Sequence, residues 1–587
     1  MPSVRELAAS LPRRWVLVGL TLLTFFFSLG GRSLNEPDEG RYAEIAREML
    51  ERGDWVVPHL WYAPHLDKPP VTYWMVAASM KLFGQNGWAV RLPLALAGIS
   101  GVAVAWLFAR SLAGARAGFW AAMILQSSLL YFAMARMLTT DILLTQFIAW
   151  AGWLLWRAWR ALQDPPATTA EAGRQRLTRF LGCICGAAAA MGLGFLTKGP
   201  IALAVPMAAL LALAWYGRGV TPRWRLLALG AMAGLAVFAL VVAPWFALVW
   251  QRVPGAFDYM AFGQAVGHAL GTAIKNRRGH PLYFVGILAV GFLPWTLLVG
   301  FLWRRAVWRN LSVLERQAWL FLSVWALVTF TIFSFSRAKL PAYILPMFPP
   351  LAILVVIRWF GAGGVHGSSA APSGLPPWAW RACLMSAALG MVAAPVAIWF
   401  VFKPQAAGWL LGYGTFGALV TGLAACRLRT ITAPGCFRAA TLLALINLAL
   451  FSLAVPSFET ALRHNQTLKP IGRALRDGYR PDDVVICWGR FPQGLPFYAA
   501  PVLSATNRPY LGGLDLTQVP FESAGNRQRF EPWVLPDEAA LVRWLTGRRR
   551  VWLVAAHGFA ESLQQREARV TLRLVLRCGY WDLFSNR

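Results

Sequence analysis

The ionisable residues best suited to chemistry gather in one polar stretch between the first apolar run and the next. Three carboxylates, at Glu36, Asp38 and Glu39, occur within four positions, and a second group containing a lysine follows them. A carboxylate can act as a base or stabilise a developing positive charge, whereas a lysine or arginine can hold a phosphate. The two groups contain Glu36, Asp38, Glu39, Arg41, Glu44, His59, His65, Asp67 and Lys68.

The first acidic group also has a purely structural explanation. The pattern predicts a helix over 38–52, which Asn35 or Asp38 could cap, and carboxylates suit the first turn of a helix. Capping does not explain the second group, which precedes an aromatic-rich apolar run at 71–83. That run is too short to cross a bilayer and is predicted to lie on the membrane surface.

Further cations stand at the short turns that we place on the same side of the membrane. One such cation alone is usually a side chain that extends its charged end from a helix terminus to the interface. Together they contradict the scarcity of Lys and Arg expected on an outer face, and they indicate a substrate that carries phosphate. Asp141 could cap its helix or hold one of these cations. The group comprises Arg136, Asp141, Lys198, Arg337, Lys339 and Tyr343, with His268 in a longer polar segment.

The composition identifies the elements that must position these residues as membrane helices. Of 587 residues, 57% are hydrophobic and only 14% are charged, which excludes an ordinary soluble protein. The net charge of +30 could suggest nucleic acid as a partner. However, the Lys and Arg residues form short clusters between apolar runs, as membrane topology requires, and we expect no nucleic-acid binding.

We predict about 13 membrane spans in a domain covering 1–457, with 31–87 as its polar outer loop. The N-terminus is placed in the cytoplasm, because the predicted inner loops carry most of the arginines. An odd number of spans then puts the C-terminal region outside. The predicted runs lie near 15–30, 88–110, 115–135, 141–162, 178–196, 200–217, 224–250, 282–303, 317–335, 340–359, 378–402, 408–426 and 437–457.

Residues 458–587 are predicted to form a separate α/β domain outside the membrane. Short strands are expected at Val484–Trp488, Val551–Ala556 and Thr571–Cys578, and helices at Gln466–Gly478, Asp537–Gly547 and Phe559–Ala568. Cys487 and Cys578 fall in this domain, and a disulfide between them is about as expected as two thiols. The Gly/Ser/Ala/Pro-rich stretch Gly361–Pro377 is predicted to be a flexible inner loop.

Five segments in this order and topology resemble the aminoarabinose transferase family. These enzymes have the GT-C architecture and are related to protein O-mannosyltransferases. The resemblance covers roughly 14–457 and rests on Asn35–Glu44, Asp67–Pro70, Arg136–Asp141, Thr197–Pro200 and Lys339–Pro346. It implies transfer of 4-amino-4-deoxy-L-arabinose from undecaprenyl phosphate to a lipid A phosphate, on the periplasmic face of the bacterial inner membrane. Such a transfer gives resistance to polymyxin-type cationic peptides.

The resemblance also implies roles for single residues. Asp38 matches the position of the family's catalytic aspartate, and we count Asp141 with it as catalytic. The donor phosphate would be held by Lys68, Arg41, Arg136, Lys198, Arg337, Lys339 and Tyr343. A lipid A phosphate is already ionised, so Asp38 is expected to orient the acceptor or stabilise the sugar cation in a direct, inverting displacement.

The remaining polar residues of the outer loops are given weaker roles. Glu36, Glu39 and His268 are candidates for acceptor or loop contacts. No cofactor is expected to be required, because a lipid monophosphate donor lacks the diphosphate that recruits a divalent metal ion. If a metal ion does bind, its candidate ligands are Glu44, His59 and His65.

Two other functions compete with this interpretation. The first is a polyprenyl-phosphate sugar transferase whose acceptor is a protein hydroxyl or another glycan, in which case Asp38 would have to act as a true base. The second is a lipid transporter. Transporters place polar groups near the bilayer midplane on inverted repeats, whereas here the ionisable residues gather at one face and no repeat is evident. This distribution favours an enzyme.

Overall fold

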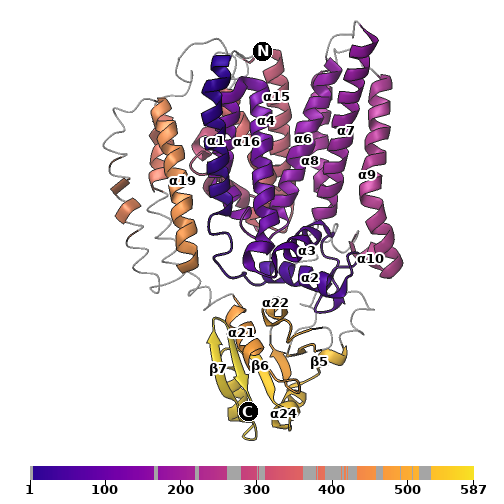
Figure 1. Ribbon diagram of the computed structural model, residues 1–587, viewed down its shortest axis with the longest axis vertical. Coiled ribbons are helices and arrows are strands. Elements are labelled where there is room, and N and C mark those ends of the chain that lie inside the picture. Colours follow the sequence, from indigo (N-terminus) through magenta and orange to yellow (C-terminus); the bar gives the residue numbers. More distant parts are fainter. Residues whose placement is uncertain are drawn as a thin grey trace.

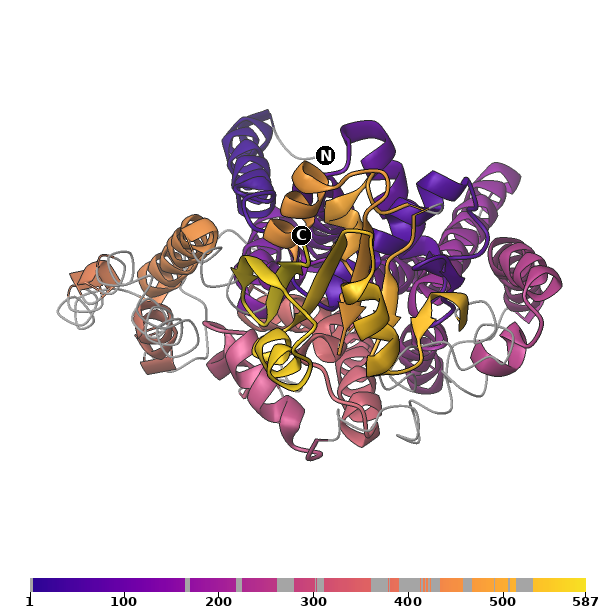
Figure 2. The same ribbon diagram turned by 90° about the horizontal axis from the view of Figure 1, so that it is seen from below.

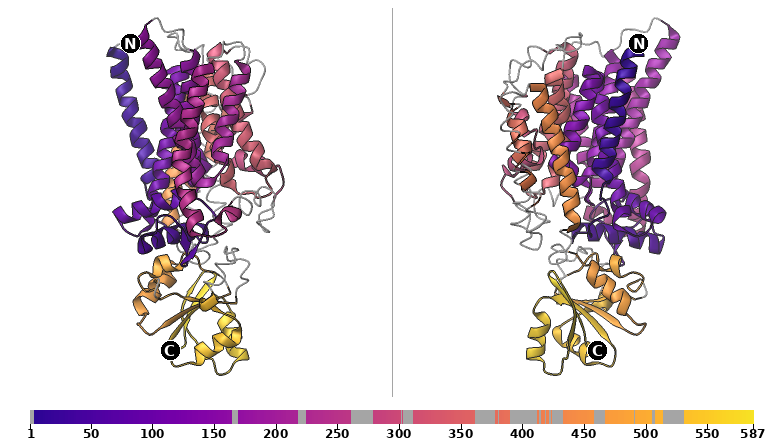
Figure 3. Two further views of the ribbon diagram at one scale, coloured as in Figure 1. Left: turned by 90° about the vertical axis from the view of Figure 1, so that its right-hand side faces the viewer. Right: turned by 60° about the vertical axis from the view of Figure 1, so that its left-hand side comes forward.

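A computed structural model shows a bundle of long helices above a smaller domain that contains a sheet (Figure 1). The structure describes residues 4–163, 169–217, 224–260, 279–300, 302, 311–360, 433–457, 467–489, 491–504, 507–513 and 531–587, with short pieces between 378 and 423. Side views show the same two layers, with the N-terminus at the end of the bundle far from the sheet domain (Figure 3).

The helices of the bundle follow the predicted apolar runs closely. Five described segments are long and apolar enough to cross a bilayer: Gly87–Ser127, Ala170–Lys198, Trp224–Arg252, Val313–Phe335 and Pro341–Arg358. The chain is therefore a multi-pass membrane protein. The bundle consists of α1 (Val4–Phe26), α4 (Gly87–Ser127), α5 (Leu129–Met134), α6 (Asp141–Gln163), α7 (Ala170–Lys198), α8 (Ile201–Tyr216), α9 (Trp224–Arg252), α10 (Ala256–Asp258), α12 (Tyr283–Gly291), α13 (Thr296–Val299), α15 (Val313–Phe335), η2 (Pro341–Met347), α16 (Phe348–Phe360) and α19 (Ala433–Ser457).

One detail of the span prediction differs in the structure, and the break between two of the predicted runs agrees with it. The run predicted as one helix over 282–303 is instead the pair α12 and α13, because Pro294 lacks the N–H that a continuous helix needs. Non-helical backbone at Ala113 and Gly114 divides α4 between the predicted runs 88–110 and 115–135, and Gly114 has a φ of +82°. The predicted total of 13 stays a prediction, since 378–402 and 408–426 lie largely outside the described residues.

The first outer loop forms a layer of its own beneath the bundle. It contains α2 (Asp38–Arg52), a hairpin of β1 (His59–Leu60) and β2 (Ala63–Pro64), and α3 (Val71–Phe83). Both helices lie across the end of the bundle that faces the sheet domain (Figure 1). The helices predicted over 38–52 and 71–83 are confirmed. Capping by Asn35 or Asp38 is wrong, because Pro37 is the N-cap of α2 and no side chain caps it.

The C-terminal part has a six-stranded mixed sheet in the order β5-β4-β3-β6-β8-β7. The neighbours in β5-β4-β3-β6 run parallel, whereas β8 is antiparallel to both β6 and β7. The predicted strands at 484–488 and 551–556 are confirmed, whereas β4, β5 and β8 were not predicted. The elements are α21 (Lys469–Gly478), β3 (Val484–Trp488), α22 (Leu495–Ala499), β4 (Tyr510–Gly512), η5 (Glu531–Trp533), β5 (Val534–Leu535), α24 (Glu538–Thr546), β6 (Val551–Ala556), α25 (Phe559–Arg566), β7 (Arg573–Cys578) and β8 (Trp581–Ser585).

The sheet order explains why Cys487 and Cys578 form no disulfide here. Cys487 lies on β3 and Cys578 on β7, with β6 and β8 between them. Three strand spacings of roughly 4.8 Å separate the two residues by about 14 Å, whereas a disulfide needs Cα atoms within roughly 7 Å. The Cys578 thiol instead donates to the Thr467 carbonyl at 3.6 Å.

The sheet domain is joined to the membrane part by packing as well as by the chain. Viewed from below, it lies under the middle of the bundle, with α19 to one side (Figure 2). Trp61 of the outer loop packs edge-on against Phe491 with ring centres 4.7 Å apart, and its indole donates to the Gln493 carbonyl at 3.2 Å. Phe497 of α22 belongs to the same buried apolar cluster as Trp61. The predicted boundary at 457/458 falls between the end of α19 and the start of α21.

Candidate active site

Two helix ends bring the first carboxylate and cation together. Asp141 is the first residue of α6 and Lys198 the last residue of α7, and their side chains form a short ion pair. The Lys198 ammonium also lies 4.2 Å from the centre of the Tyr343 ring, on η2. Of the two roles considered for Asp141, the structure shows the one in which it holds a cation. A lysine at the last turn of α7 also suits the helix dipole.

The second group of the outer loop lies beside this pair. The Lys68 ammonium donates to the Asp67 carbonyl at 2.9 Å. Burial, together with the nearby cations Lys198 and Arg41, lowers the pKa of Lys68 to about 8 against the opposing effect of Asp67 and Asp141. Lys68 therefore interacts electrostatically with Asp141 at the start of α6, with Lys198 at the end of α7 and with Arg41 of α2.

The Asp67 carboxylate is held by two neighbours. It accepts a short hydrogen bond from the Tyr259 hydroxyl, and one of its oxygens lies 3.6 Å from Nε2 of His65. Burial lowers the pKa of His65 to about 4, so this imidazole is neutral at pH 7. Asp67 is thus fixed by a phenol and a neutral histidine, and its charge faces Lys68 and Arg41.

Asp38 is the most accessible carboxylate of this region. It opens α2, its side chain is 41% exposed, and it pairs with Arg41 at 2.6 Å. Because Arg41 in turn interacts with Asp67, the first turn of α2 is connected to the Lys68 loop. We call Asp38, Arg41, Asp67, Lys68, Asp141 and Lys198 the carboxylate–cation cluster. It lies at the end of the bundle that faces the sheet domain.

Glu39, the neighbour of Asp38, points into the protein and is buried. Its carboxylate accepts from Arg91 at 2.9 Å, from Arg32 at 2.8 Å and from the backbone amide of Leu138 at 3.0 Å. Burial alone would raise its pKa, but Arg32 and Arg91 hold the pKa of Glu39 well below its ordinary range. Glu39 therefore ties α2 to α4 and to the 136–140 turn, and the acceptor role predicted for it does not fit its surroundings.

Two of the predicted phosphate-binding cations donate to backbone carbonyls in this structure. Arg136 donates to the carbonyls of Thr24 and Phe25 at 3.0 Å each, and Lys339 donates to those of Phe333 and Ser334 at 2.8 and 2.6 Å. These carbonyls lie at the C-terminal ends of α1 and α15, where four groups lack partners within the helix. We therefore leave both cations out of the carboxylate–cation cluster. Arg337, between α15 and η2, is exposed.

Glu36 lies at the junction between the two parts of the chain. Its carboxyl accepts from the backbone amide of Gly494 at 3.3 Å, and burial raises its pKa to about 8. A Cβ at Gly40 would come within 2.0 Å of one carboxyl oxygen of Glu36, and one at Gly494 within 2.3 Å. Glycine at both positions lets the sheet domain close over a largely protonated carboxyl, which is the loop contact of Glu36; its acceptor role stays a prediction.

The candidate metal ligands are dispersed in this structure. Glu44 pairs with Arg47 at 2.7 Å, His59 lies on β1, and His65 faces Asp67. Within the part of the chain that the structure describes, no three His, Cys, Asp or Glu side chains gather in a way that could hold a metal ion. His268 lies outside those residues. The metal requirement stays a prediction.

Sequence reasoning missed Arg32, Arg91 and Tyr259. Arg91 had an available signal, because it lies inside the predicted apolar run 88–110, where a charge is rare and needs a partner. Arg32 and Tyr259 had none, since a single arginine or tyrosine at a membrane surface is common. Arg32 and Arg91 pair with Glu39, and Tyr259 donates to Asp67. These contacts are known only from the folded structure.

Residues 67–246 match a protein family described as dolichyl-phosphate-mannose-protein mannosyltransferase. The undecaprenyl phosphate-alpha-4-amino-4-deoxy-L-arabinose arabinosyl transferase of Edwardsiella ictaluri is 35% identical over 352 residues, 58% of this chain and 58% of that protein. A transferase of the same description from Sodalis glossinidius is 36% identical over 341 residues, 57% of this chain and 56% of that protein. The chain thus spans less than three fifths of the length of these curated relatives.

Solved structures match over nearly the whole chain. ArnT from Cupriavidus metallidurans in the apo state has a TM-score of 0.78 at 24% identity, covering 99% of this chain and 98% of that one. The same protein bound to undecaprenyl phosphate has a TM-score of 0.77 at 24% identity, with 97% of each chain covered. The predicted fold class, a helical membrane bundle with a C-terminal α/β domain, is confirmed.

Proposed function

We propose that this chain is a glycosyltransferase. The premise is that it is a relative of the aminoarabinose transferases with their GT-C fold. Its donor would be undecaprenyl phosphate-linked 4-amino-4-deoxy-L-arabinose and its acceptor a lipid A phosphate. One structural observation supports the proposal in addition to the similarity to these relatives. The carboxylate–cation cluster joins Asp38, Lys68 and the Asp141–Lys198 pair at the one end of the bundle where α2 and α3 lie across the helices.

The cations of the cluster suit the leaving phosphate. As the bond between the sugar carbon and the phosphate oxygen breaks, its electron pair stays on the phosphate and the negative charge there grows. Lys68 and Lys198 can meet that charge, with Arg41 beside them. Lys198 is already held by Asp141 and by the Tyr343 ring, so little reorganisation is needed when the donor binds.

The acceptor side needs orientation more than deprotonation. A lipid A phosphate is ionised at pH 7, and its oxygen forms the new bond to the sugar carbon directly as the old bond breaks. We assign Asp38 to this step because its side chain is the exposed carboxylate of the cluster. It would position the acceptor or stabilise positive charge on the ring, which gives inversion without a covalent sugar–enzyme intermediate.

The whole activity is tested by mass spectrometry of lipid A from cells with and without this protein. We expect aminoarabinose-modified lipid A and polymyxin resistance only when the protein is present. The family matched by 67–246 favours a second candidate, transfer of a sugar to a protein hydroxyl. Sugar attached to protein, with lipid A unchanged, would establish that second activity instead.

The proposed side of the membrane can be tested by reporter fusions. We place the N-terminus in the cytoplasm and the sheet domain in the periplasm of the inner membrane. The Arg distribution supports this, as do the opposite positions of the N-terminus and the sheet domain (Figure 1). A reporter after Asn586 is expected to be active only in the periplasm, and one within Gly361–Pro377 only in the cytoplasm. The reverse result would put the cluster on the cytoplasmic face.

Lys68 gives the reaction a predicted pH dependence. With a pKa of about 8, its ammonium is charged below that pH and neutral above it. The kcat/KM for the donor, which reports on the free enzyme, should therefore fall as pH rises through about 8. Lys68→Arg should remove that fall, because a guanidinium stays charged.

A matched control separates Lys68 from other groups that titrate in this range. Glu36 also has a pKa of about 8, but Lys68→Arg leaves it in place. Lys81→Arg makes the same change at an exposed lysine of α3 and should keep the wild-type profile. A kcat/KM that falls equally in the Lys68→Arg enzyme would assign the titration to another group.

A further inference from the structure

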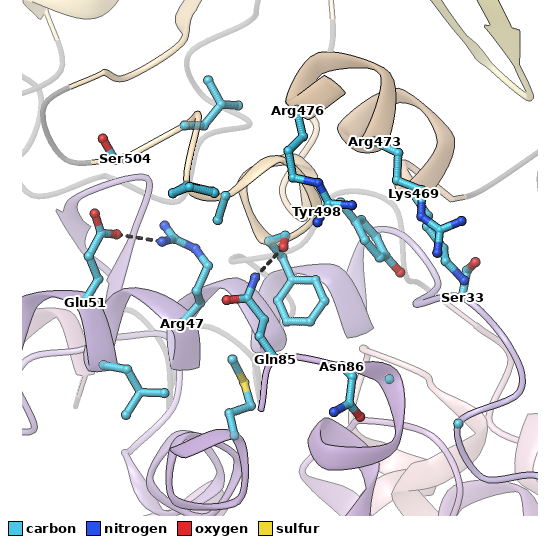
Figure 4. Close-up of a pocket in the computed structure, with 18 of the residues that line it drawn as sticks. Ser33, Arg47, Glu51, Gln85, Asn86, Lys469, Arg473, Arg476, Tyr498 and Ser504 are labelled. Carbon is cyan, nitrogen blue, oxygen red and sulfur yellow. Dashed lines mark hydrogen bonds and ion pairs between the residues drawn. The ribbon is translucent and has the colours of Figure 1, made fainter. Parts of the chain in front are cut away.

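A large cavity lies between the sheet domain and the membrane part, apart from the carboxylate–cation cluster. Its volume is about 870 Å³, and no residue of the cluster lines it. Its walls come from the loop after α1, from the ends of α2 and α3, from the start of α4, and from α21 and α22 on the sheet-domain side (Figure 4). A cavity of this volume can hold a drug-sized ligand.

The cations on the sheet-domain side of the cavity come from one helix. Arg32 is paired with Glu39, and Arg47 with Glu44 and Glu51, so the membrane side contributes little net charge. The opposite wall carries three further cations on α21, and among the described residues Glu51 is the only acid of the lining. The three are Lys469, Arg473 and Arg476.

The helical spacing of these cations places them on one face. Positions 469, 473 and 476 are separated by four and three residues, so their side chains lie above one another, whereas Ile471 and Leu475 are buried in the core. Figure 4 shows the three side chains reaching from α21 over Tyr498 toward the loop before α4. Arg473 has no ion-pair partner among the described residues. Arg476 is 4.0 Å from Asp477, and both are largely exposed.

Apolar side chains also line the cavity, which lies next to surface that suits lipid. Leu50, Met80 and Phe497 belong to its lining. Just beyond Met80, the end of α3 exposes Leu82 by 76% and Phe83 by 51%. Large exposed apolar side chains at a membrane surface fit contact with lipid. The cavity therefore combines a cationic face on α21, several apolar side chains and an edge where lipid can approach.

We propose that this cavity binds a second phosphate of the glycolipid acceptor, one that does not receive the sugar, through the cations of α21. The inference rests on the proposed function. The two sites lie at opposite ends of α2. Nine residues separate Asp38 from Arg47, which corresponds to about 14 Å of helix. An acceptor headgroup with phosphates at both ends of a disaccharide can extend along α2 and contact both sites.

The test compares two triple variants with equal loss of charge. Lys469→Ala/Arg473→Ala/Arg476→Ala removes the cationic face of α21. Arg543→Ala/Arg548→Ala/Arg549→Ala removes three exposed cations elsewhere on the same domain. With bisphosphorylated lipid A in nanodiscs, the α21 variant should bind acceptor at least about tenfold more weakly, because charge-assisted contacts to phosphate are lost. Its acceptor KM should rise equally, with kcat and donor KM within about twofold of wild type. The control variant should match wild type.

Two further comparisons, one with a different acceptor and one with a different surrounding lipid, identify the ligand. With monophosphorylated lipid A that keeps only the phosphate that receives the sugar, wild type and the α21 variant should have the same acceptor affinity, and an equal loss with both acceptors would overturn the proposal. If the loss vanishes when phosphatidylglycerol in the nanodisc is replaced by phosphatidylcholine, the cavity holds an ordinary phospholipid and the proposal is wrong. Binding is measured without donor. A wild type that binds lipid A but transfers no sugar therefore counts against the proposed function, and unchanged binding in the α21 variant counts against the cavity alone.

Discussion

Asp38→Asn is expected to lower sugar transfer by about 10²-fold or more, while the protein folds and inserts normally. The change removes one negative charge and keeps the size of the side chain. In the structure Asp38 is 41% exposed, pairs with Arg41 and caps nothing, so only a small part of the stability should depend on its charge. Activity does, if the carboxylate orients the acceptor or stabilises the sugar cation. The measurement is the fraction of lipid A modified at equal expression.

Two variants bracket this prediction. Asp38→Glu keeps the charge but moves it by one methylene, and it should also transfer poorly because the reacting groups must be held in place. Asp482→Asn makes the same chemical change at an exposed aspartate of the sheet domain and should be fully active. An Asp38→Asn enzyme that modifies lipid A at the wild-type level would remove Asp38 from the mechanism and leave Asp141 and Asp67 as the carboxylates to test.

Several helices and strands were predictable because they depend on patterns within a short stretch of sequence. The helix over 38–52 has one apolar side and ends before Gly53, whose φ of +66° suits glycine. The strands at 484–488 and 551–556 are short apolar runs flanked by polar residues, as strands buried on both faces must be. β4 and β5 have three and two residues, which is too short to leave a pattern.

The roles of the polar residues were less predictable, because they depend on partners far along the chain. Lys198 and Lys339 both stand near the C-terminal end of a helix. One meets a carboxylate from α6 and the other meets the last carbonyls of α15. Nothing local distinguishes them. The cavity was even less predictable from the sequence, because α21 meets the start of α4 only through the packing of the two domains.

Adjacent acids make the same point. Asp38 and Glu39 are equivalent candidates in the sequence, yet one is exposed and the other has a side chain only 1% exposed. The difference arises because Glu39, in the first turn of α2, pairs with Arg91 of α4, which is fully buried inside an apolar helix and requires an anion. Glu39 faces that arginine, and Asp38, one position earlier, points elsewhere. Mutations at the two positions should therefore have opposite consequences.

Glu39→Ala is expected to destabilise the protein by about 3–5 kcal/mol, the usual cost of removing one partner from a buried ion pair. It would leave the guanidinium of Arg91 buried without an anion and remove acceptors from Arg32 and from the Leu138 amide. Glu39→Gln keeps the shape and some hydrogen bonds but not the charge, so it should be destabilised less. The measurement is the melting temperature of purified protein and the amount inserted in membranes.

A double variant separates this structural role from a catalytic one. If the cost of losing Glu39 is the unpaired charge, then Arg32→Gln combined with Glu39→Gln should recover part of the stability lost in Glu39→Gln alone, because one of the two cations is removed with the anion. A catalytic glutamate would behave differently, with a normal melting temperature, lost transfer and no rescue by Arg32→Gln. That outcome would return Glu39 to the active site and would mean that the Arg32–Glu39–Arg91 arrangement does not hold α2 in place.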